Sequence, residues 1–402
     1  MQILFLSNEG LSATIFESQV LTVARIAQDR GFQVRVLSMA LTRQKLRHSQ
    51  RVRRDYERKY NVPITVLRAV PQQLPGSVEL NARRVLKVLR SLGDPPRLIQ
   101  GRSEYSAAVA MRLRSSLNSL VVWDCRGDTV SELYFRWHRR PAWLSWLAVF
   151  GDLRLKPWLR AARRADGAIF VSGALRDVEV SRGYGGSSVV VPNYADPALF
   201  RFDSKQRELT RKRLQIPENE RVFVFVGSGA PWQGLDSMRE IMRKIIQSRA
   251  DTSLLLVCDQ PDKALALFAD WGGSKVRAIS AMLHEVPQYL NAADVALLLR
   301  ARGLASEVAS PIKFAEYAMC GLPVVHNGSV AQVRSFSKRL GGNVLLKHPS
   351  SVDSLVSLDY DERALRAERA RPMLSNENTG RILGAFWSAY LSQPLTNSQE
   401  AI

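Results

Sequence analysis

The sequence is poor in cysteine, with only three among its 402 residues. Cys125, Cys258 and Cys320 lie far apart and match none of the spacings typical of metal sites, which excludes a disulfide framework or a zinc module. We therefore expect reduced thiols in a cytoplasmic protein. The chain is 46% hydrophobic, which is ordinary globular composition, so hydrophobic cores can hold it together.

Long apolar runs are also missing. The longest are well below the roughly 18 residues that a membrane-spanning helix requires. The start, MQILFLS, is too short and lacks the basic residues of a signal peptide, so we interpret it as a first strand. These absences predict a cytoplasmic protein whose contact with a membrane is peripheral, on the inner face.

Acidic residues are few compared with basic ones. There are 37 aspartates and glutamates against 57 lysines and arginines, which gives a net charge of +20. Such an excess favours an anionic partner: nucleic acid, acidic lipid or a phosphorylated substrate. Composition does not choose among them. The five histidines fit no metal or catalytic-triad spacing, and we predict no metal site: His48, His138, His284, His326 and His348.

The first half of the chain alternates short apolar strands with amphipathic helices. A strand at residues 3–6, a helix at 16–29 and a strand at 33–38 give a βαβ start, which is typical of a parallel, doubly wound sheet. A strongly basic helix is predicted at 42–60, either as a solvated face or as a binding surface. Further strands are predicted at 64–70, 98–100, 120–123, 167–171 and 188–191.

A second series of strands begins after a polar stretch at residues 200–217. These strands are predicted at 221–227, 254–259, 276–280, 295–300 and 322–326. We expect two doubly wound α/β domains: residues 1–204, joined by a returning terminal helix in 380–402, and residues 205–379. Two such domains are expected to face a central cleft, with the carboxyl ends of both sheets toward it.

Residues 134–164 depart from this alternation, because they combine tryptophan with seven arginines and one lysine. This mixture suits a lipid interface, and it could also stack nucleic-acid bases or simply pack within the protein. We expect Pro141 and Pro157 to break the segment into short helices. The tryptophans are Trp137, Trp143, Trp146 and Trp158.

The stretch 309–327, ASPIKFAEYAMCGLPVVHN, combines a helix start with unusual charges. Ser310 is the predicted N-cap and Pro311 the first helical residue, with the helix ending before Gly321. Lys313 and Glu316 then lie on one face. A lysine in the first turn opposes the helix dipole, so the pattern indicates a ligand phosphate bound by Lys313 and the helix amides. The alternative is a surface Lys–Glu pair.

A second candidate phosphate site follows the strand at 221–227. Gly227 is followed by SGAPWQGLD and then a helix, and backbone amides of such a loop can approach a diphosphate. Both features belong to one half of the chain, and together they describe a nucleoside-diphosphate site. The loop lacks the Walker Lys-Ser/Thr and the full GxGxxG, which disfavours kinases and dehydrogenases.

SPIKFAEYAMCGLPVV resembles the donor-site signature of glycosyltransferases with the B fold. The resemblance is to the large retaining group numbered family 4 (glycosyl transferases group 1), in its SPxK-type branch, and it covers nearly the whole chain. Other stretches agree with that family in order along the chain: FLSNEG, FESQV, QGRSEYSA, VVWDCRGD, ADGAIFVS, VVPNYADPALF, FVGSGAPWQGLD and VPQYLNAADVALLL.

This resemblance implies a retaining, hexosyltransferase-type enzyme built from two Rossmann-like domains. The second domain would bind a UDP-, GDP- or other nucleotide sugar, and the first would bind a glycan or lipid-linked acceptor in cell-surface polysaccharide or glycolipid synthesis. No metal or other cofactor is expected to be required. The implied donor residues are Gly227, Ser228, Gly229, Gln233, Ser280, Arg300, Ser310, Pro311, Ile312, Lys313 and Glu316, with Glu316 on the ribose.

The donor half departs from the family pattern in two places. Many members carry Glu-x7-Glu, and the first acid falls here on Val308; Glu307 is adjacent, but it would point the other way in an extended segment. Many members also carry an Arg and a Lys in the glycine loop, where Ser228 and Gln233 stand. Lys313 is then the chief protein charge on the leaving diphosphate, with Arg300 as a weaker candidate.

The acceptor half departs from the family in one position, because Arg126 stands in DCRGD where a histidine is frequent. We predict Lys313, Glu316 and Arg126 as the catalytic residues. The predicted acceptor-side residues are Glu9, Gly10, Arg102, Asp124 and Asp128. For Asp124 and Asp128, which bracket Arg126, a strand-end salt bridge is an equal alternative.

Two alternatives to a transferase remain open from the sequence. A sugar-nucleotide 2-epimerase shares the architecture but needs acid and base carboxylates in the cleft. A catalytically weakened sugar-nucleotide-binding scaffold subunit would explain the residues at positions 308, 228 and 233. A nucleic-acid binder is disfavoured because no recognition module is present.

Overall fold

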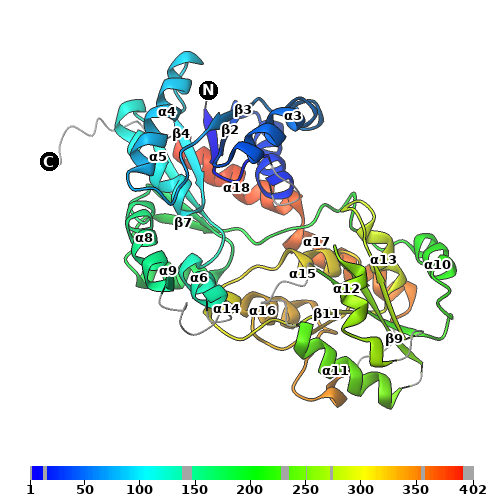
Figure 1. Cartoon of the computed structure of the whole chain (residues 1–402). Helices are drawn as coiled ribbons and strands as arrows, with labels where there is room; N and C mark the ends of the chain where they lie inside the picture. Colours follow the sequence, from blue (N-terminus) through cyan, green and yellow to red (C-terminus); the bar gives the residue numbers. More distant parts are fainter. Residues whose placement is uncertain are drawn as a thin grey trace. The chain divides into compact units, whose positions relative to one another are not determined.

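The computed structural model divides the chain into two compact units (Figure 1). Unit 1 comprises Met1–Val191 and Gly380–Ile402, and unit 2 comprises Pro192–Thr379. The structure describes residues 2–11, 16–137, 147–227, 235–249, 251–271, 275–354 and 358–392. The chain leaves unit 1 earlier than residue 204, because Asn193 bonds to Ser310 and Ala195 bridges to Ser375.

Unit 1 contains a seven-stranded parallel sheet in the order β3-β2-β1-β4-β5-β6-β7. The order reverses between β1 and β4, which makes the sheet doubly wound as predicted. Its strands are β1 (Ile3–Ser7), β2 (Val34–Ala40), β3 (Ile64–Arg68), β4 (Leu98–Arg102), β5 (Leu120–Cys125), β6 (Gly167–Phe170) and β7 (Ser187–Val190).

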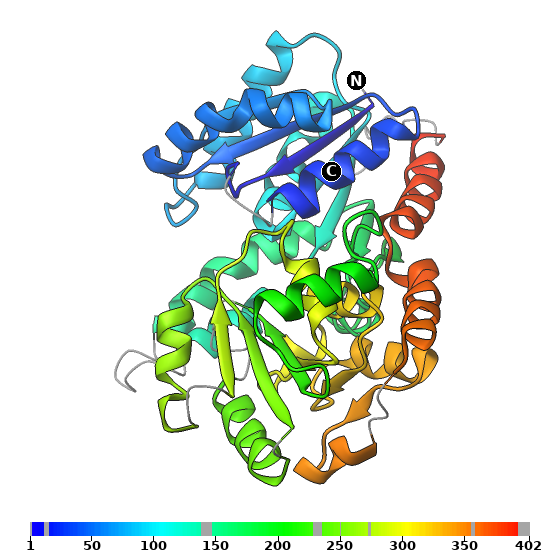
Figure 2. The ribbon, with the colours of Figure 1, turned by 90° about the vertical axis from the view of Figure 1, so that its right-hand side faces the viewer.

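Helices connect these strands, and the last helix of the chain returns to them. The ribbon of α18, red in Figure 2, lies beside the blue elements of this unit. Trp387 of α18 is fully buried, donates to Gln100 Oε1 at 3.0 Å and meets the ring of Phe5 edge-on. The helices are η1 (Glu17–Leu21), α2 (Thr22–Asp29), α3 (Arg43–Tyr60), α4 (Ser77–Ser91), α5 (Ser103–Leu117), α6 (Thr129–Trp137), α8 (Leu147–Ala162), α9 (Gly173–Ser181) and α18 (Asn376–Leu391).

The prediction that Pro157 breaks a helix is wrong, because α8 continues through it. A proline inside a helix removes one backbone hydrogen bond, and tertiary packing compensates here. The neighbouring Trp158 ring packs edge-on against Tyr105 of α5 at 4.8 Å, and Leu155 and Leu159 are buried. Pro141, Trp143 and Trp146 lie outside the described residues.

Unit 2 contains a six-stranded parallel sheet in the order β10-β9-β8-β11-β12-β13. Its strands are β8 (Arg221–Val226), β9 (Thr252–Val257), β10 (Val276–Ile279), β11 (Val295–Leu298), β12 (Val324–His326) and β13 (Val344–Leu345). Its helices are α10 (Ser204–Arg213), α11 (Leu235–Ser248), α12 (Pro261–Ala266), η3 (Ala269–Trp271), α13 (Val286–Ala292), α14 (Leu304–Glu307), α15 (Ile312–Met319), α16 (Ala331–Leu340), η4 (Pro349–Ser354) and α17 (Tyr360–Leu374).

The sheet of unit 2 is buried on both faces. Successive side chains of a strand point to opposite faces, so Val222 and Val224 of β8 pack with residues of α13, α15 and α16. Phe223 and Phe225 pack on the other face, with residues of α11. This two-sided burial leaves the carboxyl edge of the sheet as the place where polar side chains can gather.

Candidate functional site

The start of α15 differs from the prediction. Its N-cap is Pro311 rather than Ser310, and no side chain caps the first turn. Ser310 Oγ instead accepts a hydrogen bond from the backbone N–H of Asn193 at 2.8 Å, and the Ser310 carbonyl accepts from Asn193 Nδ2 at 2.5 Å. The serine therefore anchors the linker, and the amides of the first turn are left without a side-chain cap, as an anion site requires.

The first turn of α15 lies beside the end of β8. The backbone N–H of Val226 donates to Tyr317 Oη at 3.0 Å, and Lys313 Nζ lies 5.2 Å from the ring centre of Phe225. Gly227 directly follows β8, so the lysine and the start of the glycine-rich loop lie at the same edge of the sheet. Ser228, Gly229 and Gln233 of that loop lie outside the described residues.

Lys313 and Glu316 are both shifted toward their neutral forms. Glu316 is only 6% exposed, and burial raises its pKa to about 7 although Lys313 opposes the shift. Burial lowers the pKa of the partly buried Lys313 to about 8, and the positive charge of Arg300 lowers it further, while Glu316 opposes this shift. An anionic ligand at the lysine would stabilise its charged form, so the site favours binding an anion.

Asn327 holds the loop that follows β11. Its Nδ2 donates to the carbonyl of Arg300 at 2.6 Å, and its Oδ1 accepts from Ser329 Oγ at 2.8 Å. Sequence reasoning did not assign Asn327 to the site; its position directly after β12, at the same edge, is the signal. Ser280 is exposed directly after β10, at this edge but two strands away from β8.

A cavity of about 790 Å³ opens at the carboxyl ends of β11, β12 and β13. Arg302, Asn327 and Lys347 line it, together with Glu307 and Arg334. Its polar and basic lining adjoins Arg300 through the bonded Asn327. Arg300, Lys313 and Glu316 do not line this cavity, so it lies at the same edge of the sheet as the start of α15 but does not enclose it.

The residues before α15 include Val308, which occupies the position where many family members carry the first acid of Glu-x7-Glu. Val308 is fully buried, so its side chain cannot meet a ligand. Glu307 ends α14 and pairs with Arg334 at 2.5 Å. The segment is not extended: these residues belong to a helical turn, in which neighbouring side chains differ in direction by about 100° rather than by a reversal.

In unit 1, four predicted residues meet at the ends of β4 and β5 and in the loop after β1. Arg126 Nε lies 2.7 Å from Asp124 Oδ1, and Arg102 Nη1 lies 3.9 Å from Asp124 Oδ2. Arg102 also pairs with Glu9, Nε to Oε1, at 3.1 Å. Gly10 follows with a φ of +73°, a backbone conformation that favours glycine.

Asp128 belongs to a different group. It pairs with Arg182 at 2.8 Å and accepts from Ser131, whereas the strand-end salt bridge with Arg126 is made by Asp124. Sequence reasoning also missed Glu104, which is buried and accepts from Thr129 Oγ1 at 2.9 Å. Burial raises the pKa of Glu104 to about 7. The signal was present in QGRSEYSA, where an acid follows the end of β4.

Among the described residues, no group of three or more His, Cys, Asp and Glu side chains is placed to hold a metal ion. The groups that can bind an anion at the sheet edges are arginine side chains in unit 1, and Lys313 with the backbone N–H groups of α15 in unit 2. The prediction that no metal is required stays a prediction.

The fold is the glycosyltransferase B fold, as comparison with solved structures shows. Sucrose-phosphate synthase from Thermosynechococcus elongatus is similar at 15% identity and a TM-score of 0.66, covering 97% of this chain and 99% of that chain. Anabaena HepE in complex with UDP-glucose gives 15% identity and a TM-score of 0.69, covering 97% and 100%. WaaG, a glycosyltransferase involved in lipopolysaccharide biosynthesis, gives 15% identity and a TM-score of 0.61, also covering 97% and 100%.

The sequence of unit 2 adds a family match. Residues 220–356 match the family described as glycosyl transferases group 1. This range contains β8, α15 and Asn327, so the matched segment includes the whole carboxyl-edge site of unit 2. No curated protein matches the chain by sequence.

Proposed function

We propose that the protein is a sugar-nucleotide-dependent glycosyltransferase whose unit 2 binds the donor and whose unit 1 binds the acceptor. The observation that carries this proposal is the start of α15: uncapped amides and Lys313 beside the end of β8, with the buried Glu316 one turn further on. The glycosyl transferases group 1 match over residues 220–356 supports the same interpretation.

In this proposal the donor diphosphate lies at the start of α15. The amides, Lys313 and Arg300 compensate the charge that develops on the leaving diphosphate, which is the main electrostatic requirement of transfer. Glu316, as a carboxylate, accepts hydrogen bonds from the ribose hydroxyls. The reaction retains the configuration of the sugar. It requires no metal, because the helix amides and the cationic side chains compensate the diphosphate charge, and it requires no protein base, because the leaving phosphate takes the acceptor proton.

The acceptor binds at the carboxyl edge of the sheet of unit 1. Asp124 orients Arg102 and Arg126, so their guanidinium groups are fixed before a substrate arrives. Arg126, 13% exposed in its side chain, binds an acceptor hydroxyl or a phosphate near the reacting centre. Its guanidinium group carries hydrogen-bond donors and no acceptor, so it binds oxygen atoms rather than taking a proton, which fits a mechanism without a protein base.

The acceptor is a glycan, in particular a lipid-linked one used in cell-surface polysaccharide or glycolipid synthesis. The support is the net charge of +20 and the basic α3, which favour an anionic membrane surface on its cytoplasmic side. Within the described ranges, no helix has the length and hydrophobicity for crossing a bilayer. Failure of the full chain to bind anionic liposomes at low salt would overturn the membrane part of this proposal.

A catalytically weakened binder is the second candidate, and the burial of Val308 favours it. A family acid is frequent at this position, and here no carboxylate can enter the site from it. Both candidates bind the donor. Turnover distinguishes them: a weakened binder shows donor binding and no transfer against a broad panel of acceptors.

Thermal-shift measurement with UDP-, GDP-, ADP- and dTDP-sugars tests the donor site. A ligand at about 100 times its dissociation constant stabilises the folded state by about 2.7 kcal/mol. Lys313→Ala and Glu316→Ala should abolish the shift that the matching donor gives. Lys338→Ala, which removes an exposed charge from α16, is the matched control and should keep it.

Circular dichroism of each variant without ligand establishes that the fold is intact. If Lys313→Ala and Glu316→Ala both retain the shift, the donor site lies elsewhere. If no sugar nucleotide shifts the wild-type protein, the donor assignment itself is wrong.

A further inference from the structure

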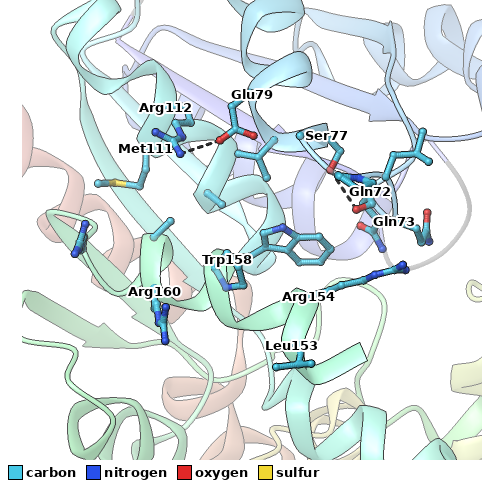
Figure 3. Close-up of a pocket in the computed structure, with 18 residues that line it drawn as sticks. Gln72, Gln73, Ser77, Glu79, Met111, Arg112, Leu153, Arg154, Trp158 and Arg160 are labelled. Carbon is cyan, nitrogen blue, oxygen red and sulfur yellow. Dashed lines mark hydrogen bonds and ion pairs between the residues drawn. The ribbon is translucent and has the colours of Figure 1, made fainter. Parts of the chain in front are cut away.

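A second cavity lies in unit 1, away from the residues that the proposed transfer uses. It has a volume of about 660 Å³ and lies between the loop before α4 and the helices α5 and α8 (Figure 3). None of the charged residues at the carboxyl edge of this sheet, such as Arg102, Asp124 or Arg126, lines it. Its size falls within the range of small-molecule sites.

The rim of this cavity is strongly basic. Four arginines line it against a single acid, Glu79, which pairs with Arg112 at 2.8 Å. The other three, Arg154, Arg160 and Arg164, come from α8 and the turn that follows it, and form no ion pair with any carboxylate that the structure describes. Arg160 and Arg164 are four residues apart and so lie on the same side of this segment. Their charge favours an anionic ligand.

The wall of the same cavity is apolar. Trp158 lies in the middle of it, with Arg154 extending toward the loop that carries Gln73 (Figure 3). The Trp158 ring is fixed by its edge-on contact with Tyr105. Leu74 and Leu153 also line the cavity and are 52% and 53% exposed. Large apolar side chains left in water beside arginines are typical of surfaces that meet lipid.

The combination selects one chemical class of ligand. A small inorganic anion would use the arginines but would leave Trp158, Leu74 and Leu153 without a partner. A neutral sugar would leave the arginines without one. A phosphate carried on an apolar chain uses both, because the phosphate can accept charge-assisted hydrogen bonds from arginine while the chain covers the leucines and the tryptophan.

We propose that the cavity between α4, α5 and α8 binds a lipid phosphate, with the phosphate at Arg154 and Arg160 and the apolar chain along Trp158, Leu74 and Leu153. The proposal rests on the proposed function only for the origin of that ligand. A lipid-linked acceptor and a membrane phospholipid carry the same chemistry, and the experiment separates them.

Binding of the full chain to citronellyl phosphate, a soluble prenyl phosphate, tests the cavity, with inorganic phosphate as the second probe. The variant Arg154→Glu/Arg160→Glu should bind citronellyl phosphate at least about tenfold more weakly than wild type. The control Lys338→Glu/Arg339→Glu makes the same change of charge at exposed positions of α16 in unit 2 and should stay within about twofold. Equal losses in both variants would mean attraction by net charge alone and would overturn the proposal.

Leu153→Ser tests the apolar part, since this exposed side chain can be changed with little risk to the fold. It should weaken binding of citronellyl phosphate severalfold and leave inorganic phosphate unchanged. If inorganic phosphate binds wild type as tightly as the prenyl phosphate does, the apolar chain contributes nothing and the proposal is wrong.

Vesicles of phosphatidylcholine with and without phosphatidylglycerol, at about 0.15 M salt, separate the two sources. Competition by phosphatidylglycerol vesicles against citronellyl phosphate supports a membrane phospholipid as the occupant, and its absence supports a prenyl-phosphate acceptor. The sugar-nucleotide thermal shift should be the same in wild type and in Arg154→Glu/Arg160→Glu. If wild type binds citronellyl phosphate but no sugar nucleotide raises its melting temperature, the proposed transferase is refuted and the lipid-phosphate site is not.

Discussion

The carboxyl edges of the two sheets both bury charge, but they do so differently. In unit 1, Asp124 is 2% exposed and lies between the guanidinium groups of Arg102 and Arg126. In unit 2, Lys313 and Glu316 come from one helix, and burial moves both pKa values toward neutral pH. The first arrangement is a network between strands, and the second is a pair whose charged forms are costly without a ligand.

This difference separates two roles that a buried charge can have. A network of carboxylate and guanidinium groups compensates its own charges and fixes the positions of the side chains. A pair with pKa values near 7 and 8 changes its charge easily, so a bound anion alters its energy strongly. We therefore expect substitutions in unit 1 to act mainly on stability, and substitutions in unit 2 to act mainly on ligand binding and on its pH dependence.

The largest expected effect comes from removing the charge of Asp124. Asp124→Asn leaves Arg102 and Arg126, which are 7% and 13% exposed in their side chains, without their shared carboxylate. Breaking a buried pair in this way costs about 3–5 kcal/mol, so the free energy of unfolding in urea should fall by about this amount. Asp177→Asn, in an exposed pair with Arg176, is the control and should cost less than about 1 kcal/mol. Equal effects of the two changes would remove the distinction between the two edges.

A smaller effect, of opposite sign, is expected for Glu316→Gln. Folded Glu316 keeps its proton up to about pH 7, whereas a glutamate in the unfolded chain has its ordinary pKa of 4.5. The folded state therefore binds more protons between these values, and the contribution of Glu316 to stability, present below pH 4.5, is lost as the pH rises through about 7. The variant lacks this loss, so relative to wild type it should gain about 1–3 kcal/mol between pH 5 and pH 8.

Lys313 limits the size of that gain. Its pKa is lowered to about 8, so its contribution to stability, present above about pH 10.5, is lost as the pH falls through 8. Glu316 is its counter-charge, so the variant also loses the attraction between the two side chains. Urea unfolding at pH 5 and pH 8 measures the difference, and Glu240→Gln, at an exposed position of α11, should show none. A variant that is stabilised at pH 8 and no longer binds the donor would show that Glu316 serves binding at a cost in stability. If Glu316→Gln is destabilised at pH 8, the pair behaves like the network of unit 1.

The fold was predictable because its strands are short apolar runs with helices between them. The strands from β1 to β12 form where the pattern places them, since a parallel sheet buried on both faces gives nearly continuous hydrophobic segments. The strand β13, Val344–Leu345, was missed because two residues carry no pattern. The continuation of α8 through Pro157 was missed for a different reason. It depends on packing of Trp158 against Tyr105, a long-range contact that rules based on neighbouring residues do not describe.

The candidate site was predictable in its composition and less so in its bonding. The grouping of Lys313 and Glu316 follows from their spacing in a helix, which the structure has. The partners of Ser310 and Asp128 could not be derived, because Asn193 and Arg182 lie 117 and 54 residues away in sequence. Ser310 matched the rules for an N-cap, but its hydroxyl group accepts a hydrogen bond from the backbone N–H of Asn193 instead. Long-range partners of polar side chains depend on the fold as a whole.

The smallest effect is expected for Glu307→Gln. Glu307 and Arg334 pair at 2.5 Å with side chains 40% and 39% exposed, and such pairs contribute about 0–1 kcal/mol. The variant should therefore lose less than about 1 kcal/mol in urea unfolding and keep its sugar-nucleotide affinity within about twofold. Isothermal titration calorimetry with the donor that gives the largest thermal shift measures the affinity. A loss of tenfold or more, with stability unchanged, would mean that Glu307 replaces the acid absent at Val308, and unit 2 would then carry a second carboxylate in contact with the donor.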